Sequence, residues 1–243
     1  MFRHKGKGRT YSHNLKLASI LSFVAGTVNI TGVLALGTLT TNVTGHFAFF
    51  SEELFFKNIE MAFVSLVYIL FFLTGAFVSG LLIELVSKSK YYLAYILPIS
   101  IEIIVLTACS FLYLLFPNSI FNYSILLSCL LLFSMGIQNA LVTRISNSVV
   151  RTTHLTGLFT DLGIELSQII TKKVITEKNK IKRDIQLKLI IIFCFFCGGI
   201  IGGFLYTRFK LATLLFPTIL LLFALWYDRL LFRFYYFKRK HRH

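Results

Sequence analysis

The sequence predicts an all-α protein that crosses a membrane several times. Hydrophobic residues make up 56% of the 243 residues, while charged residues make up 14%, against about 25% in an ordinary soluble domain. The mean hydropathy is +0.75. About 20 apolar residues are needed to cross a bilayer, so half of the chain is enough for six spanning helices. This composition excludes a soluble globular protein.

Each predicted span is a continuous apolar stretch that is long enough to cross the hydrocarbon layer with some tilt, although the last one is short. The six stretches are residues 15–39, 59–86, 91–116, 120–142, 187–206 and 211–227. The distribution of Lys and Arg between the segments that join them predicts the orientation. The two tails and the segments after the second and fourth spans hold 22 of the 25 Lys and Arg residues. By the positive-inside rule, both termini face the cytoplasm.

The chain also contains an internal repeat. Residues 41–54 and 153–166 are identical at six of fourteen positions. Two further features follow in the same order in both copies. They are a glycine-rich segment, in the second and fifth spans, and a proline, in the third and sixth spans. The predicted divisions are a basic cytoplasmic tail (1–16), repeat one (17–116), repeat two (117–230) with a basic cytoplasmic loop at about 171–188, and a basic cytoplasmic tail (231–243).

Three spans in each copy place the two copies in opposite orientations. The sequence therefore predicts six transmembrane helices arranged as a 3+3 inverted repeat, a design typical of transporters and found in some channels, with a substrate site near the midplane. The simpler interpretation is that the shared motifs are generic small-residue packing motifs.

Short half-helices are expected after spans one and four, over residues 40–53 and 151–165. Both segments are threonine-rich and half apolar. Thr44 and Thr156 can cap their first turns. Gly45 and Gly157 let the backbone bend or approach a ligand closely. These four residues are candidate substrate-binding residues.

A half-helix whose N-terminus points into a cavity presents free N–H groups and a positive dipole end, which suit an anion. Arg151 and His154 add positive charge in the second copy, so they are also candidate substrate-binding residues. The alternative is a cytoplasmic interfacial helix on which Arg151 meets lipid phosphate.

Polar side chains inside the spans are further candidates. Asn29, Gln138 and Asn139 should face the bundle interior, where they either bind a substrate or hold helices together. Glu102 lies near the middle of the third span and is a candidate for proton coupling; the alternative is a protonated structural acid. Glu53 and Glu165, together with Asp161, are expected to be solvated ends of the half-helices.

Catalytic residues, metal ligands and cofactors are not expected. The sequence has no H-E-x-x-H, G-x-S-x-G or phosphate-binding glycine loop. Its four cysteines lie within apolar stretches, where they act as small apolar residues. The basic, aromatic C-terminal tail suits anionic lipid headgroups better than nucleic acid.

Three segments, residues 42–46, 136–146 and 150–157, resemble the YoaK family of bacterial inner-membrane proteins, with similarity over about residues 17–227. The resemblance implies a multi-pass protein of the bacterial inner (plasma) membrane and supplies neither a substrate nor a catalytic residue. The basic C-terminal tail and the segment near 172–188 look peripheral to the family pattern.

The leading functional hypothesis is a small secondary transporter of a polar or anionic small molecule. One rival is a passive channel of the same design, and another is a lipid-interacting membrane protein or enzyme in which Arg151, His154 and Asp161 face a headgroup. The expected partners are the lipid bilayer and an unidentified small-molecule solute. A homodimer is compatible with so thin a bundle.

Overall fold

The structure is a computed structural model that describes residues 11–87, 93–116, 120–146, 148–171 and 175–240. Throughout these ranges the secondary structure is helical, with no strand. The elements are α1 (Tyr11–Leu36), α2 (Val43–Phe55), α3 (Ile59–Ser87), α4 (Leu93–Leu115), α5 (Ile120–Ser146), α6 (Leu155–Thr171), α7 (Ile175–Phe209), the 3₁₀ helix η3 (Lys210–Leu214) and α8 (Leu215–Lys240). Residues 1–10 of the predicted N-terminal tail and residues 241–243 of the C-terminal tail lie outside the described residues.

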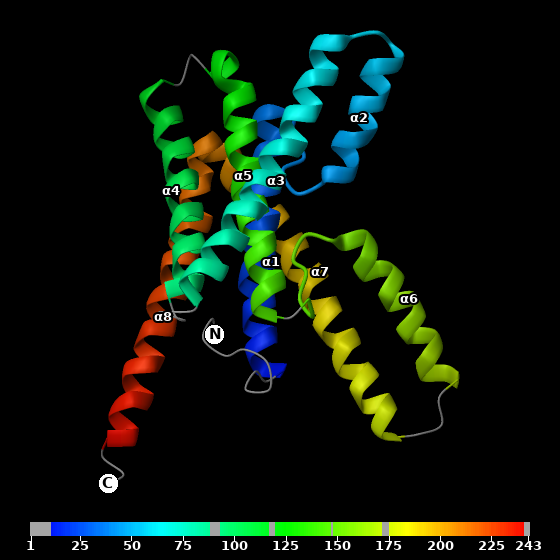
Figure 1. The fold of residues 1–243 in the computed structure, drawn as a ribbon, viewed down its shortest axis with the longest axis vertical. Coiled ribbons are helices and arrows are strands. Elements are labelled where there is room, and N and C mark those ends of the chain that lie inside the picture. Colours follow the sequence, from blue (N-terminus) through cyan, green and yellow to red (C-terminus); the bar gives the residue numbers. More distant parts are fainter. Residues whose placement is uncertain (1–10, 88–92, 117–119, 147, 172–174, 241–243) are drawn as a thin grey trace.

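Five helical stretches in the described chain are long and apolar enough to cross a membrane: Tyr11–Leu36, Ile59–Ser87, Leu93–Leu115, Tyr123–Ser146 and Glu177–Tyr227. The first four coincide with the first four predicted spans. The last is 51 residues long and takes in both the fifth and the sixth. The chain turns back within it, because α7 and α8 meet at η3, where Lys210 has a φ of 50°. In Figure 1 the first turns of α7 and the end of α8 both lie in the lower half of the molecule.

The bundle is held together by two tightly packed helix pairs, α1 with α7 and α3 with α5. Glycines permit this packing. A Cβ on Gly26 of α1 would lie 2.0 Å from the Phe195 carbonyl oxygen of α7, and a Cβ on Gly136 of α5 would lie 2.1 Å from the Phe72 carbonyl oxygen of α3. The same holds in the reverse direction: a Cβ on Gly75 would lie 2.0 Å from the Phe133 carbonyl oxygen, and a Cβ on Gly198 would lie 2.1 Å from the Phe23 carbonyl oxygen. Only glycine allows backbones to approach this closely.

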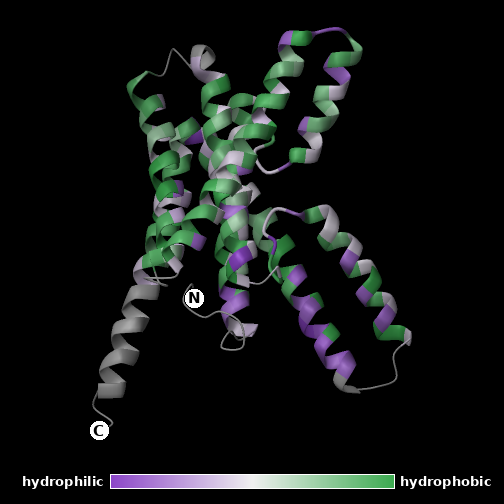
Figure 2. Cartoon of the chain, in the orientation of Figure 1, coloured by the Kyte–Doolittle hydropathy of each residue, from purple (hydrophilic) through white to green (hydrophobic). Residues whose placement is uncertain are grey.

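Two helical hairpins project from the same side of the bundle. Helix α2 packs on α3, and α6 packs on α7; Figure 1 shows the α2–α3 hairpin above and the α6–α7 hairpin below. The sequence predicted a basic loop at about 171–188. This prediction is wrong from Ile175 onward, because those residues form the first turns of α7. These turns are hydrophilic, while most of the bundle is hydrophobic (Figure 2).

Candidate functional site

The chain folds back after α1 because glycine ends that helix. Gly37 has a φ of 66°, a conformation that glycine adopts readily. The following loop returns along the bundle, where the Thr38 hydroxyl bonds that of Ser128 on α5 at 2.8 Å. Two turns before the end of α1, Asn29 Oδ1 accepts hydrogen bonds from the Thr41 N–H at 3.3 Å and the Thr41 hydroxyl at 3.0 Å. Asn29 thus fixes the point at which the chain enters α2.

Helix α2 is capped by Asn42. Its side-chain oxygen accepts a hydrogen bond from the Gly45 N–H at 3.0 Å. The prediction that Thr44 caps this turn is therefore wrong: Thr44 lies inside the helix and is exposed. One turn on, Nε2 of buried His46 donates to the Leu39 carbonyl at 2.8 Å, which ties the first turn of α2 to the returning loop.

Helix α6 begins in a corresponding way. His154 stands just before it, and its carbonyl accepts the Leu158 N–H at 3.1 Å. The His154 ring covers the first turn, since a Cβ on Gly157 would lie 2.4 Å from its Nδ1. Thr156, which the sequence proposed as a cap, lies within the helix and is exposed. The loop before α6 is held by Ser146, whose Oγ accepts the Val150 N–H at 2.9 Å.

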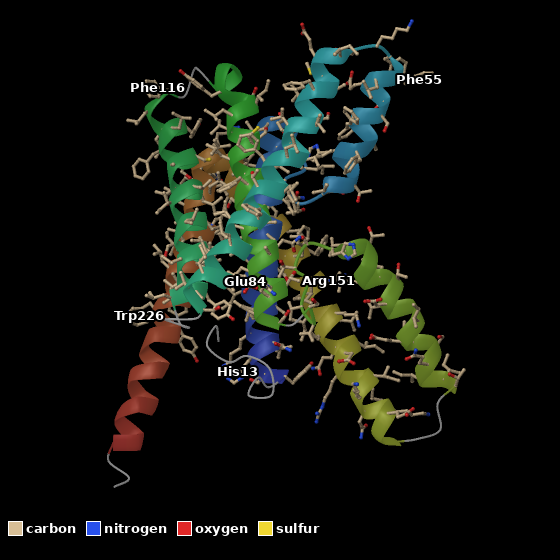
Figure 3. The ribbon with its side chains drawn as sticks, viewed as in Figure 1. His13, Phe55, Glu84, Phe116, Arg151 and Trp226 are labelled. Atoms are coloured by element: carbon tan, nitrogen blue, oxygen red, sulfur yellow. The ribbon has the colours of Figure 1, made fainter. Side chains whose placement is uncertain are left out.

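The starts of the two short helices meet at one pocket, with a volume of about 640 Å³. Helices α1 and α5 and the N-cap of α2 each supply one side-chain amide, and two phenylalanines come from α3 and α7. The lining residues are Asn29, Leu39, Thr41, Asn42, Val43, Thr44, Phe72, Asn139, Thr143, Arg151, Thr153, His154, Leu155, Thr156 and Phe195. Figure 3 shows Arg151 beside the start of α6, between the two hairpins.

The pocket carries positive charge. None of the described residues that line it is acidic. Arg151 is exposed and forms no ion pair with any described carboxylate. The Asn139 side chain lines the pocket and is not hydrogen-bonded within the described part of the chain. A cation, a free amide and the N-terminal ends of two helices together form a surface suited to an anion.

The structure brings six of the predicted site residues to this pocket: Asn29, Thr44, Asn139, Arg151, His154 and Thr156. Gly45 and Gly157 lie behind it in the first turns of their helices. Gln138 points elsewhere, because its Nε2 donates to the Leu21 carbonyl of α1 at 2.9 Å. Glu102 lies in α4 and does not line the pocket; it is 0% exposed, and neither of its oxygens has a hydrogen-bond partner among the described residues.

The acidic residues of the short helices have different surroundings. Glu165 forms an ion pair with Lys188 of α7, and both side chains are largely buried, at 17% and 15% exposed. The expectation that Glu165 is solvated is therefore wrong, because the long first half of α7 brings a lysine alongside it. Glu53 is half-buried, and Asp161 is exposed.

Several pocket residues are not among those that the sequence predicted, including Thr41, Asn42, Phe72 and Phe195. Asn42 could have been identified, since asparagine is a stronger N-cap residue than threonine and stands three residues before Gly45. The phenylalanines carried no signal, because they are apolar residues within apolar spans.

These features define a multi-pass membrane protein with a cationic pocket between two short helices. The chain belongs to the family described as "Protein of unknown function (DUF1275)", whose profile matches residues 17–227. It is similar to the UPF0700 transmembrane protein YoaK of Bacillus subtilis (strain 168), with 28% identity over 188 residues, which cover 76% of this chain and 80% of that protein. The resemblance to the YoaK family is thereby confirmed. No solved structure matches the chain.

Proposed function

We propose that the protein is a small secondary transporter of an anionic solute, built as a 3+3 inverted repeat. The observation that carries the proposal is the pocket shared by the first turns of α2 and α6. Among the described residues, Arg151 has no ion-pair partner there and no lining residue is acidic. Transporters with inverted repeats bind their substrates where discontinuous helices from the two halves meet.

The repeat is supported by matched contacts. Gly26 and Gly136 occupy corresponding positions in the two copies, and a Cβ added to either would lie 2.0 or 2.1 Å from a phenylalanine carbonyl oxygen of the other copy. The two phenylalanines also occupy corresponding positions, since Phe72 lies three residues before Gly75 and Phe195 lies three residues before Gly198. Buried hydroxyls without a described partner occur at the equivalent residues Thr40 and Thr152. Counting α7 and α8 separately on the two sides of η3 gives six crossings.

The helix lengths support a re-entrant arrangement. Ten residues separate Val43 at the start of α2 from Glu53, and ten separate Leu155 at the start of α6 from Glu165. At 1.5 Å per residue each segment rises about 15 Å. Two such segments end to end match the roughly 30 Å hydrocarbon layer. With both glutamates near the membrane surfaces, the two helix N-termini meet at the midplane.

The orientation follows from the charge distribution. We take the first turns of α7, which are rich in Lys and Arg, as the cytoplasmic side. The first turn of α1 and the end of α8 lie toward the same end of the molecule (Figure 1). Both termini are then cytoplasmic. Glu102 supplies a membrane-embedded carboxyl that can couple substrate movement to protons, although it acts from outside the pocket.

The test is uptake of labelled inorganic phosphate, sulfate and small carboxylates into proteoliposomes, with and without a proton gradient. Arg151→Gln should lower the rate for the transported anion by about tenfold or more, because it removes a charge-assisted hydrogen bond. Arg208→Gln is the matched control, since Arg208 is also exposed but lies in the last turn of α7, away from the pocket.

Equal loss of uptake in both variants would contradict the assignment of the pocket. Flux that neither saturates nor responds to a gradient would indicate a channel. If no anion moves but Asp161→Asn abolishes lipid turnover, the lipid-enzyme hypothesis replaces transport.

A separate variant tests proton coupling. Glu102→Gln should abolish gradient-driven accumulation of the anion and retain anion exchange. Normal accumulation in this variant would exclude coupling through Glu102.

A further inference from the structure

The pocket is open on the side where the two hairpins project. Arg151, His154 and Thr156 line it, and all three are exposed. Among the described helices, α2 has its main contact with α3, and α6 with α7. Figures 1 and 3 show α2 and α6 diverging from the level of Arg151 toward opposite ends of the molecule. The exposed side chains of Arg151, His154 and Thr156 make the pocket accessible from outside the bundle.

Large apolar side chains lie beside this opening. Phe72 and Phe195 line the pocket beside its polar groups. On the short helices, Phe47 is 52% exposed and Phe159 is 59% exposed, each one turn from the pocket. Large exposed apolar side chains of this kind are expected to face lipid tails in a membrane protein. The opening therefore joins a cationic polar pocket to an apolar exterior.

We propose that the anion bound in this pocket is the headgroup of a membrane amphiphile, which enters sideways between α2 and α6 and leaves its acyl chain against the exposed phenylalanines. This inference rests on the proposed anion site and names its substrate class. The polar groups of the pocket are complementary to a phosphate or carboxylate, and the exposed phenylalanines beside it are complementary to a hydrocarbon chain. A free anion has no acyl chain, so it would leave the exposed phenylalanines beside the pocket without a partner.

Tryptophan quenching by brominated lipids tests this directly. The chain has one tryptophan, Trp226, so a Trp226→Phe background allows a single reporter. Phe159→Trp places the reporter beside the opening. Phe77→Trp places the control reporter on α3, at a side chain that is 65% exposed and has apolar Leu73 and Leu81 one turn away on either side. Both are aromatic replacements at exposed positions, which the fold should tolerate. Each variant is reconstituted into phosphatidylcholine vesicles containing a small fraction of brominated phosphatidylglycerol or brominated phosphatidylcholine.

For the reporter at Phe159, we expect brominated phosphatidylglycerol to give about fivefold stronger local enrichment than brominated phosphatidylcholine, the effect of one basic residue on an anionic lipid. Arg151→Gln should abolish this preference, and Arg208→Gln should leave it. For the control reporter at Phe77, the two lipids should quench equally.

Other outcomes overturn the inference. If the two brominated lipids quench equally at Phe159 while inorganic phosphate changes the emission in an Arg151-dependent way, the site binds free anions, and the proposed function stands without this substrate class. If neither lipid quenches and a cysteine at Ser51 of α2 cross-links two chains, a second copy covers the opening. If neither lipid preference nor phosphate response is found, the anion site itself fails.

Discussion

Replacing Gly136 with alanine should separate α5 from α3. The new Cβ would lie 2.1 Å from the Phe72 carbonyl oxygen, whereas carbon and oxygen normally approach no closer than about 3.3 Å. The helices would have to move apart by about 1 Å, which forfeits a quarter to a half of each dispersion contact along the seam. Overpacking of this kind costs about 1–3 kcal/mol. We expect the free energy of unfolding to fall by about that amount.

The assay is thermal unfolding in a mild detergent, followed by the loss of the monodisperse peak in size-exclusion chromatography. Gly80→Ala is the matched control, because Gly80 lies in the same helix pair and a Cβ there would meet nothing within 4 Å. It should be neutral or stabilising, since alanine favours helix by about 1 kcal/mol. Gly26→Ala should match Gly136→Ala, given its 2.0 Å contact. If Gly136→Ala and Gly80→Ala had equal stability, the close α3–α5 contact would be refuted.

Three further predictions concern the short helices and the bundle. Asn42→Ala should lower the free energy of unfolding by about 1 kcal/mol, because it removes the N-cap of α2. Thr44→Ala should lower it by less than about 0.5 kcal/mol in the same thermal assay. A larger loss for Thr44→Ala than for Asn42→Ala would show that Thr44 is the cap. Lys188→Ala should cost about 1–2 kcal/mol because it leaves the Glu165 carboxylate unpaired at 17% exposure, and adding Glu165→Gln should recover most of the loss if the ion pair is its cause. Gln138→Leu should change the free energy of unfolding by less than about 1 kcal/mol, since it removes one hydrogen bond and also one buried oxygen without a described partner. Uptake should be unchanged in this variant. A loss of uptake would show that Gln138 belongs to the site.

Much of the fold was accessible from the sequence. Apolar length alone located the first four membrane-spanning stretches, and the threonine–glycine segments predicted helices close to α2 and α6. The helical character of residues 175–188 was missed, because a dense run of basic residues resembles a loop until its packing against α6 is known.

The site was predicted less completely. The repeat brought Thr44 and Thr156 to attention together, and both line the pocket. The role of Asn29 in holding the returning loop depends on how far the chain turns back after α1, which no local pattern encodes. The sequence also predicted Gln138 as a pocket amide. Gln138 and Asn139 are adjacent in α5, so their side chains point in different directions, and Gln138 points toward α1.

The most direct test of the central claim is the accessibility of Thr44 and Thr156 from the two sides of the membrane. In a variant without the native cysteines, which are free in the structure, a single cysteine at either position is treated with a membrane-impermeant thiol reagent from outside or inside. We expect that both positions react from either face, or alternate with conditions, because both line one pocket. Reaction of Thr44→Cys only from outside and of Thr156→Cys only from inside would contradict a shared pathway.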